Sequence, residues 1–429
     1  MQGTGIKEHE ICSLVLVPVS IFRHKYRGRI KNPAINQNCH DKRFFLLHYL
    51  TVMIKYATSL LLLIVLMSCG APTPDKAVIV DTPPPYEAPA TVFPGKAWQE
   101  TTPAEVGIDT ATLSEALSFL NTHCKADGLE EVMVIRHGRM AWSGDSITKV
   151  HDIWSCTKSF VSTAVGLLAA EGKLQLDQPV ADHEPSLQQA YPDATYRHFL
   201  TMTSGYNAVG QSRWGEPSED WSLTPFEPAP PLFAPGTAYT YWDEAMIKLG
   251  QALTIAAGTS LENYLAELLM YPIGIKDWTW WTEEALPDGT PINFGGTGIK
   301  MCAADQARFG LLFLNDGVWK GQRILPEGWV KEATVSQVSK DLALADTDRK
   351  ATDGRGIYGY NWWVINAADG ISPVDAYYTS GLNHNICLVI PAWDMVIVRM
   401  GIDGNPEYGK HRLYSELLQR LAGGVRVNM

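Results

Sequence analysis

The sequence predicts a mixed α/β fold of the α+β type, with one antiparallel sheet built from strands near both ends of the chain. Apolar segments of strand length lie at 131–143 and again at 360–400. Segments with apolar residues at helical spacing lie between them. Strands and helices therefore occupy separate parts of the chain. This order favours one sheet flanked by helices, with a mostly helical region inserted at about residues 175–300.

The first elements follow from local patterns. Residues 131–137 and 140–143 are predicted strands, and Gly138-Arg139 between them favours a tight turn, so they form a hairpin. A helix is predicted directly after Ser155, because the segment SFVSTAVGLLAAEGKL carries apolar residues at helical spacing and has a glycine near its end.

The later elements alternate less regularly. The predicted helices lie at 243–257, 260–269, 306–314 and 326–334, with a final helix at 411–421. The predicted late strands lie at 360–365, 376–380, 385–390 and 395–400. Because the early hairpin needs partners, we expect these late strands to complete its sheet.

Charge is distributed unevenly along the chain. The 429 residues carry a formal net charge of −11. Residues 1–68 hold nine Lys and Arg against three Asp and Glu, a charge of +6, which leaves −17 on the remainder. Phosphate binding needs clustered Lys and Arg, so the acidic remainder argues against a nucleic-acid partner. With 46% hydrophobic and 19% charged residues, a disordered or collagenous protein is excluded.

The N-terminal part resembles a bacterial lipoprotein signal. Residues 57–67 are an apolar run of 11 residues, whereas a membrane-spanning helix needs about 20. The run follows Lys55 and precedes the segment LMSCG, which contains Cys69. The resemblance implies that Cys69 is lipidated and becomes the mature N-terminus, on the periplasmic face of a bacterial cell envelope. The alternative is a short buried helix with an ordinary cysteine.

The chain accordingly divides into four predicted regions. Residues 1–52 are an upstream mis-translation, a disordered segment or a long n-region, and 53–68 form the signal peptide. Residues 69–97 are a proline-rich tether, since seven prolines lie between 70 and 97. Residues 98–425 are the folded catalytic domain.

The candidate chemistry begins at Ser155. A serine hydroxyl must be activated by a base, and Lys158 lies three residues later, on the same face of a helix. Ser146 and Lys149 have the same spacing, but no apolar helix follows them. We therefore choose the pair Ser155 and Lys158, because the helix behind it would bury and fix both side chains.

Six segments then resemble one superfamily, in its order along the chain. They lie at 154–160, 199–205, 235–250, 304–312, 356–364 and 378–391. They are similar to the motifs of the serine β-lactamases, penicillin-binding proteins and esterases, nearest to the class C-like branch with family VIII esterases and 6-aminohexanoate-dimer hydrolases. The resemblance runs from about residue 99 to 422 and implies a β-lactamase-like fold.

The resemblance implies a serine hydrolase that cleaves a small-molecule ester or amide through an acyl-enzyme, with no cofactor and no metal. Ser155 would be the nucleophile, and Lys158 the general base or the holder of a proton relay. Tyr241 would shuttle a proton between Ser155 and the leaving group. The N–H groups of Ser155 and Leu382 would form the oxyanion hole.

Two departures from the family pattern bear on the substrate. Asp243 stands where the second motif usually ends in Asn, and it could pair with Lys158 and keep it charged, which would favour Tyr241 as the base. Thr379 stands where the third motif usually opens with Lys or His. In β-lactamases a cation near this point helps bind a substrate carboxylate. Its loss fits an ester, or an amide without that group, and His384 could partly replace the cation or simply cap a turn.

The remaining substrate-binding candidates are Trp242, Ser380 and Gly381. Trp242 is our preferred aromatic wall of the cleft, and glycine at 381 would let the strand approach the substrate closely. Two alternatives stay open. One is a β-lactamase or D-amino-acid peptidase, and the other is a penicillin- or peptidoglycan-binding lipoprotein without turnover.

The cysteines of the catalytic domain are predicted to be free thiols. Seven cysteines in 429 residues do not form a disulfide framework. The four in question are Cys124, Cys156, Cys302 and Cys387.

Overall fold

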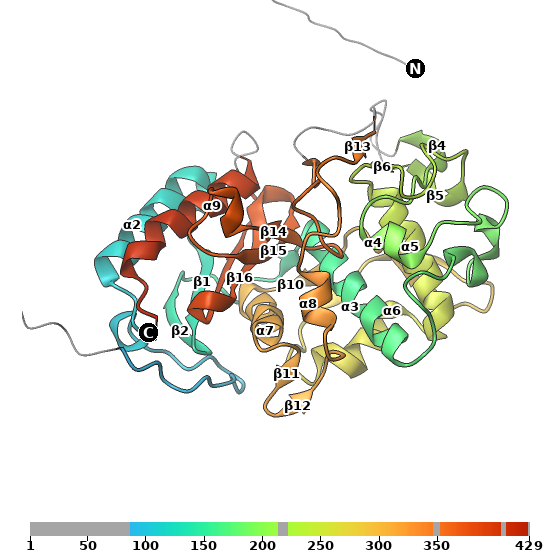
Figure 1. Cartoon of the computed structure of the whole chain (residues 1–429). Coiled ribbons are helices and arrows are strands. Elements are labelled where there is room, and N and C mark those ends of the chain that lie inside the picture. The colour runs from blue at the N-terminus through green and yellow to red at the C-terminus, as the bar shows by residue number, and fades with distance from the viewer. Residues whose placement is uncertain (1–85, 213–221, 346–351, 405–408, 428–429) are drawn as a thin grey trace, which may run out of the picture. The chain divides into compact units, whose positions relative to one another are not determined.

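The computed structural model describes residues 86–212, 222–345, 352–404 and 409–427. These ranges belong to the second of the two units into which the chain divides, residues 83–429, and Figure 1 shows their helices and strands. The predictions for residues 1–52, the signal peptide at 53–68 and the lipidation site Cys69 lie outside the described residues. None of the helices within the described ranges is long and apolar enough to cross a bilayer.

A six-stranded antiparallel sheet forms the centre of the unit, with strand order β14-β15-β16-β17-β1-β2. Its strands are β1 (Glu131–Arg136), β2 (Arg139–Ser143), β14 (Trp363–Ile365), β15 (Ala376–Gly381), β16 (Asn385–Ile390) and β17 (Met395–Met400). The early hairpin joins the late strands through β1 and β17, where Glu131 pairs with Met400 and Arg136 with Met395. The prediction of one antiparallel sheet built from both ends is confirmed.

Helices cover both faces of this sheet. The helices are α2 (Thr110–His123), α3 (Thr157–Ala170), α4 (Tyr196–Leu200), α5 (Asp243–Ala257), α6 (Leu261–Leu265), α7 (Ala303–Leu314), α8 (Trp329–Ala333) and α9 (Lys410–Leu421). Successive residues of a strand point to opposite faces, so Val396 and Val398 of β17 pack in one core with α7, while Ile397 packs in a second core with α2 and α9. Helices α2 and α9 lie side by side over this second face (Figure 1).

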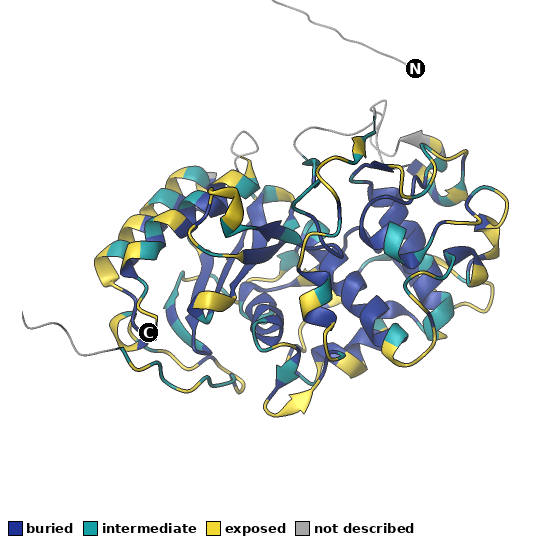
Figure 2. Cartoon of the chain, viewed as in Figure 1, coloured by how far each residue is buried: buried dark blue, intermediate teal, exposed yellow. Residues whose placement is uncertain are grey.

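The region between β3 and β14 combines helices with short strands. These strands are β3 (His151–Asp152), β4 (Ala208–Ser212), β5 (Ser222–Pro228), β6 (Ala238–Tyr239), β7 (Thr279–Trp280), β8 (Thr282–Ala285), β9 (Pro291–Asn293), β10 (Ile299–Met301), β11 (Val318–Trp319), β12 (Gln322–Arg323) and β13 (Ala343–Leu344). The predicted insertion at about 175–300 contains β4 to β10 and is therefore less purely helical than predicted. Helix α3 is buried along nearly all of its length (Figure 2), as expected for a helix that is apolar on most sides.

The N-terminal segment of the unit differs from the prediction of a tether over 69–97. The Tyr86 hydroxyl is bonded to His137 Nε2 at 2.8 Å, and the Val92 N–H donates to the His137 carbonyl. Further along, Arg308 donates to the Gly95 carbonyl at 2.8 Å. Residues 86–97 are thus packed on the domain, because these polar contacts hold them, and only residues before 86 remain candidates for a tether.

Candidate active site

Ser155 and Lys158 meet at the start of the buried helix α3. Ser155 lies in a short 3₁₀ turn, Trp154–Cys156, that leads directly into α3. The Lys158 Nζ donates to the Ser155 Oγ at 2.8 Å. Trp154 has a left-handed φ of 53°, and its N–H is held by the Asp152 carboxylate at 2.6 Å. The strained backbone of Trp154, kept in place by Asp152, therefore helps to fix the position of the Ser155 hydroxyl.

The competing pair with the same spacing is not arranged in this way. Ser146 lies in a turn, where it accepts from the Lys149 N–H, and the Lys149 side chain is 44% exposed. Its ammonium pairs with Glu131 at 3.2 Å. Of these two pairs, the one at 155 and 158 combines a contact between the serine and lysine side chains with burial of the lysine.

Three acceptors surround the Lys158 ammonium. They are the Ser155 Oγ, the Gly296 carbonyl at 2.8 Å and the Asp243 carboxylate, which forms an ion pair with it. Lys158 is 1% exposed and Asp243 is 9% exposed. The possibility that Asp243 pairs with Lys158 is therefore confirmed. All three partners are oxygen atoms that can accept a hydrogen bond from an ammonium group.

Tyr241 lies beside the same ammonium. Its ring centroid is 4.8 Å from the Lys158 Nζ, close enough for a cation–π attraction. The ring stacks on Trp363 at 6.0 Å between centroids and meets the edge of Tyr358 at 6.1 Å. Burial raises the pKa of Tyr358 well above its usual value. The structure thus brings the predicted catalytic side chains at 155, 158 and 241 together.

The end of strand β15 lies against the nucleophile segment. A Cβ placed on Gly381 would lie 2.2 Å from the Ile153 carbonyl oxygen and 3.2 Å from the Trp154 Cβ. Only glycine fits at position 381. The lack of a side chain therefore allows close contact with the backbone of Ile153, whereas the prediction was a close approach to the substrate. Leu382 follows directly and is 56% exposed. The two predicted oxyanion donors, Ser155 and Leu382, therefore belong to segments in close contact.

The Thr379 side chain does not support the prediction that it binds substrate. It is fully buried. Its hydroxyl donates to the Cys156 Sγ at 3.2 Å and accepts from Gln306 at 3.1 Å and from the Cys387 N–H at 3.0 Å. These contacts use the hydroxyl to join β15, β16 and α7 beneath the site.

Trp242 also differs from its predicted role as a cleft wall. It is 6% exposed, and its indole N–H donates to Glu244 at 3.3 Å. Trp363 is the half-buried tryptophan that stacks on Tyr241, while its neighbour Trp362 is fully buried. Trp363 is the first residue of β14, and Trp362 directly precedes this strand.

Sequence reasoning missed the cation at the third motif. His384, the predicted substitute, is 2% exposed, and its ring lies 6.4 Å from that of Tyr414. Instead, Lys410 at the start of α9 donates to the Ser380 Oγ at 3.2 Å and to the Gly381 carbonyl. Burial, together with the nearby Lys158 charge, lowers the pKa of Lys410 to about 8. No motif marks Lys410, so only the fold reveals it.

The cysteines of the catalytic domain are not part of the candidate chemistry. The cysteines at 124, 156, 302 and 387 are free and buried, as predicted. Burial raises the pKa of Cys156 to about 11, so this thiol is not activated. In the described ranges, no group of three or more His, Cys, Asp or Glu residues could hold a metal ion.

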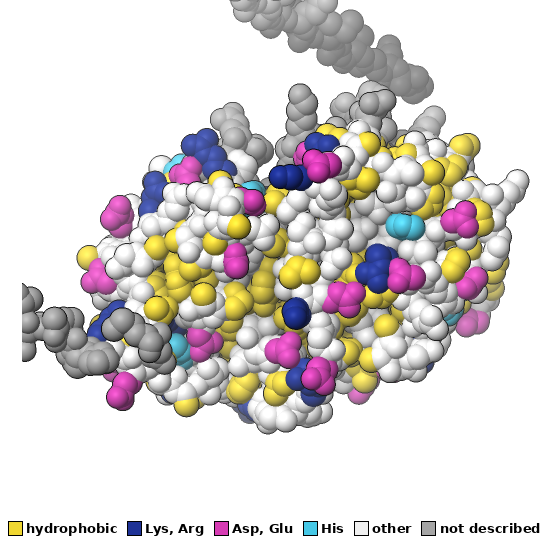
Figure 3. Space-filling view, in the orientation of Figure 1, with side chains coloured by type: hydrophobic (Ala, Val, Ile, Leu, Met, Phe, Trp, Pro, Cys, Tyr) yellow, Lys and Arg dark blue, Asp and Glu magenta, His cyan; other side chains and the backbone are white. Residues whose placement is uncertain are grey.

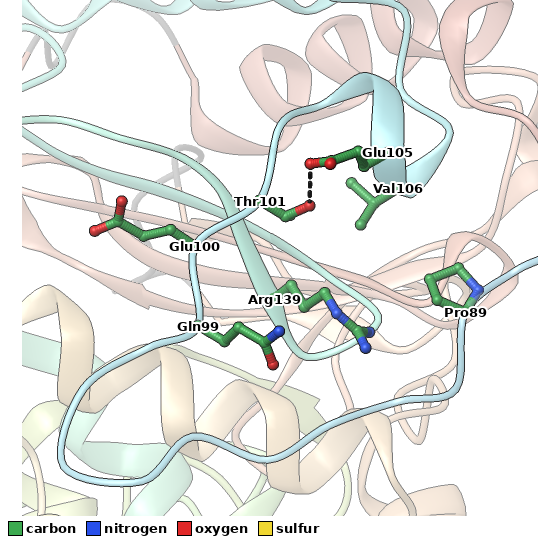
Figure 4. Close-up of a pocket in the computed structure, with 7 residues that line it drawn as sticks. All are labelled: Pro89, Gln99, Glu100, Thr101, Glu105, Val106 and Arg139. Atoms are coloured by element: carbon green, nitrogen blue, oxygen red, sulfur yellow. Dashed lines mark hydrogen bonds between the residues drawn. The ribbon is translucent and has the colours of Figure 1, made fainter.

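A separate polar depression lies near the N-terminal segment (Figure 4). Its volume is about 320 Å³. Its lining residues are Pro89, Gln99, Glu100, Thr101, Glu105, Val106 and Arg139. The Thr101 hydroxyl donates to Glu105 at 3.0 Å across it. None of the candidate catalytic residues contributes to this depression.

Comparisons with known proteins bear on the family and the fold. A family model described as Beta-lactamase matches residues 130–419. The chain is 24% identical over 333 residues to the 6-aminohexanoate-dimer hydrolase of Paenarthrobacter ureafaciens, covering 71% of this chain and 81% of that protein. It is 32% identical over 143 residues to esterase EstB of Burkholderia gladioli, covering 29% and 36%. A class C beta lactamase structure from Rhodobacter sphaeroides superposes with a TM-score of 0.51 at 16% identity, covering 73% of this chain and all of that one.

The likeness to the solved structure supports the fold, and the family match covers more than half of the chain and includes the serine–lysine pair. The chain therefore belongs to the beta-lactamase family and is a serine hydrolase.

Proposed function

We propose that this protein cleaves an ester or amide bond of a small molecule through an acyl-enzyme on Ser155. The observation that carries the proposal is the 2.8 Å contact between Lys158 Nζ and Ser155 Oγ, at a half-buried serine that a substrate can reach. The hydroxyl oxygen would attack the carbonyl carbon and form a tetrahedral intermediate. Its collapse would expel the alcohol or amine and leave an acyl ester, which water would then hydrolyse.

Tyr241 is the better candidate for taking the serine proton. A charged Lys158 with three acceptors has no lone pair to offer. The Lys158 Nζ lies 4.8 Å from the centroid of the Tyr241 ring, so the two side chains can act together on the serine proton. Tyr241 would accept the proton from Ser155 and pass it to the leaving group, while Lys158 would hold the serine oxygen in place. The N–H groups of Ser155 and Leu382 would bind the developing oxyanion.

The substrate class follows from the third motif and from the relatives. Thr379 is buried and offers no charge to a substrate carboxylate, and the nearby Lys410 donates to Ser380 and to the Gly381 carbonyl. One relative is named for hydrolysis of the 6-aminohexanoate dimer and another as an esterase. These observations favour an ester or amide over a β-lactam.

Steady-state hydrolysis of p-nitrophenyl acetate and butyrate, measured beside nitrocefin, tests the proposal. Turnover of the esters should fall by about 10³-fold or more in Ser155→Ala. Ser146→Ala is the matched control, because Ser146 has the same spacing to a lysine but lies in a turn, and it should retain activity. A stoichiometric burst without turnover would instead indicate a binding protein, and faster turnover of nitrocefin would indicate a β-lactamase.

We further propose that the protein is anchored by lipid at Cys69 to the envelope of a bacterium. The support is the basic and apolar segment before this cysteine. Labelling with radioactive palmitate should disappear in Cys69→Ala, and labelling that persists would reject the anchor. We also propose that nucleic acid is not a partner, because the residues after 68 carry a net charge of −17. On the face shown in Figure 3, Lys and Arg are scattered among Asp and Glu.

A further inference from the structure

The turn that follows β15 is held by its carbonyl groups. Four consecutive carbonyl oxygens, those of residues 381–384, each accept a hydrogen bond from a side chain outside the turn. The donors, in order, are Lys410 to Gly381, Asn385 to Leu382 at 2.7 Å, Arg399 to Asn383, and Tyr414 to His384 at 3.3 Å. They come from α9, β16 and β17, so three elements fix one short turn.

The turn needs this support because its backbone is strained. Asn383 and His384 both have a φ of 58°, in the left-handed region that residues other than glycine rarely adopt. Each such residue costs about 1 kcal/mol or more and persists only where the surroundings impose it. Four side chains keep the turn in this strained conformation. We infer that the conformation is needed because it fixes the direction of a backbone N–H in this turn.

The peptide group between Gly381 and Leu382 is the one that Lys410 binds. In a trans peptide the C=O and the N–H point to opposite sides of the chain. An ammonium on the Gly381 oxygen therefore fixes the direction of the Leu382 N–H. It also draws electron density toward the oxygen, which makes the N–H a stronger donor.

The two sides of this strand end face different partners. Ser380 contacts Lys410 of α9, while its neighbour Thr379 contacts Cys156 beside the nucleophile. Adjacent residues of a strand point to opposite faces. Lys410 therefore approaches β15 from the α9 side, and the nucleophile segment lies on the other side, in contact with Gly381.

We propose that Lys410 is a positioning residue, which orients and polarises the Leu382 N–H toward the oxyanion by binding the Gly381 carbonyl. This inference rests on the proposed function, in which Leu382 is an oxyanion donor. Within the described ranges, both hydrogen-bond partners of Lys410 are neutral oxygens. Its charge is thus directed at the turn and not at a carboxylate.

Kinetics separate this role from a merely structural one. In Lys410→Met, kcat for p-nitrophenyl butyrate should fall about tenfold, less than for complete loss of an oxyanion donor, while KM changes less than about twofold. Lys410→Arg should recover much of the loss, because arginine keeps the charge and the donor. Lys410→Gln, a neutral donor, gives a second comparison in case the Met variant folds poorly.

Arg412→Met is the matched control. Arg412 lies on the same helix, its side chain is 72% exposed, and it pairs with Glu416. Removing this charge from α9 should leave kcat and KM close to those of the unmodified protein.

A second measurement follows the Leu382 amide without any need for turnover. The full chain is labelled with nitrogen-15 leucine, and Leu382→Ile identifies the resonance by removing it. Lys410→Met should shift the amide proton upfield, because the N–H loses polarisation, and Arg412→Met should not.

A resonance that does not move in Lys410→Met would overturn the inference, whether or not kcat falls. An unchanged kcat in an active enzyme would overturn it as well. Failure of the proposed function looks different. Suppose that the unmodified protein hydrolyses no ester or amide while the Leu382 resonance still moves in Lys410→Met. In that case the positioning of the Leu382 N–H by Lys410 is supported, and the assignment as an esterase or amidase is rejected.

Discussion

Asp243 and Lys158 form a buried ion pair at the centre of the candidate site. Removing one partner leaves the other charge buried without compensation, which costs about 3–5 kcal/mol. We expect Asp243→Ala to lower the free energy of unfolding by about this amount, measured by urea denaturation. Asp243→Asn should cost less, because the amide oxygen can still accept from Lys158.

The double variant Asp243→Ala with Lys158→Met is the control for this prediction. If the loss comes from an unpaired charge, removing the second charge should restore part of the stability. If the loss of unfolding free energy in the double variant equals the sum of the losses in the two single variants, the two residues contribute to stability independently.

Single residues show where sequence reasoning succeeds. The contact between Ser155 and Lys158 was predicted from helical spacing together with the apolar helix that follows, since the same spacing at Ser146 and Lys149 gives no such contact. The pairing of Asp243 with Lys158 was raised as a possibility from the family resemblance, because the two residues lie 85 positions apart in the sequence. Lys410 could not be found in this way. It lies 29 residues after Gly381, and only the packing of α9 on the sheet brings the two together.

At the scale of elements, the approach of β15 to the nucleophile turn depends on one glycine. A Cβ at Gly381 would lie 2.2 Å from the Ile153 carbonyl oxygen, and this atom cannot move without shifting the turn that holds Ser155. Gly381→Ala should therefore lower kcat strongly and cost about 1–3 kcal/mol of stability. Ester hydrolysis and urea denaturation measure the two effects.

Gly423→Ala is the control for that substitution. A Cβ at Gly423 would meet no atom within 4 Å, so this variant should match the unmodified protein in both measurements. Full activity in Gly381→Ala would mean that the two segments can separate, and that their close contact is not required for the chemistry.

Elements with a strong periodic pattern were predicted well. Helix α5 and strands β16 and β17 have the bounds that the sequence indicated. Helix α2 was missed, although its buried residues Leu113, Ala116, Leu117 and Leu120 recur at helical spacing after the capping Asp109. Most of the short strands in the inserted region were also missed. Two or three residues contain too little periodicity to be recognised, and such strands form only because a partner strand lies beside them.

At the scale of the whole molecule, the sheet ties the two ends of the catalytic unit together. Strand β1 pairs with β17, and the buried Arg136 at the end of β1 donates to the Trp393 and Arg426 carbonyls. The general architecture was predictable because strands at both ends need a common sheet. The N-terminal boundary of the unit was not, since prolines before residue 97 suggested a tether although this segment makes specific contacts.

The boundary can be tested by shortening the chain to residues 86–429 or 99–429. The first keeps every described contact. The second loses the bond between Tyr86 and His137, the Gly95 carbonyl that binds Arg308, and Trp98, which is 8% exposed in the main core. Loss of a buried tryptophan alone costs about 3–5 kcal/mol, and Arg308 would lose an acceptor. We expect 99–429 to unfold at distinctly lower urea concentration than 86–429. Equal midpoints would mean that residues 86–98 add nothing to folding and belong with the tether after all.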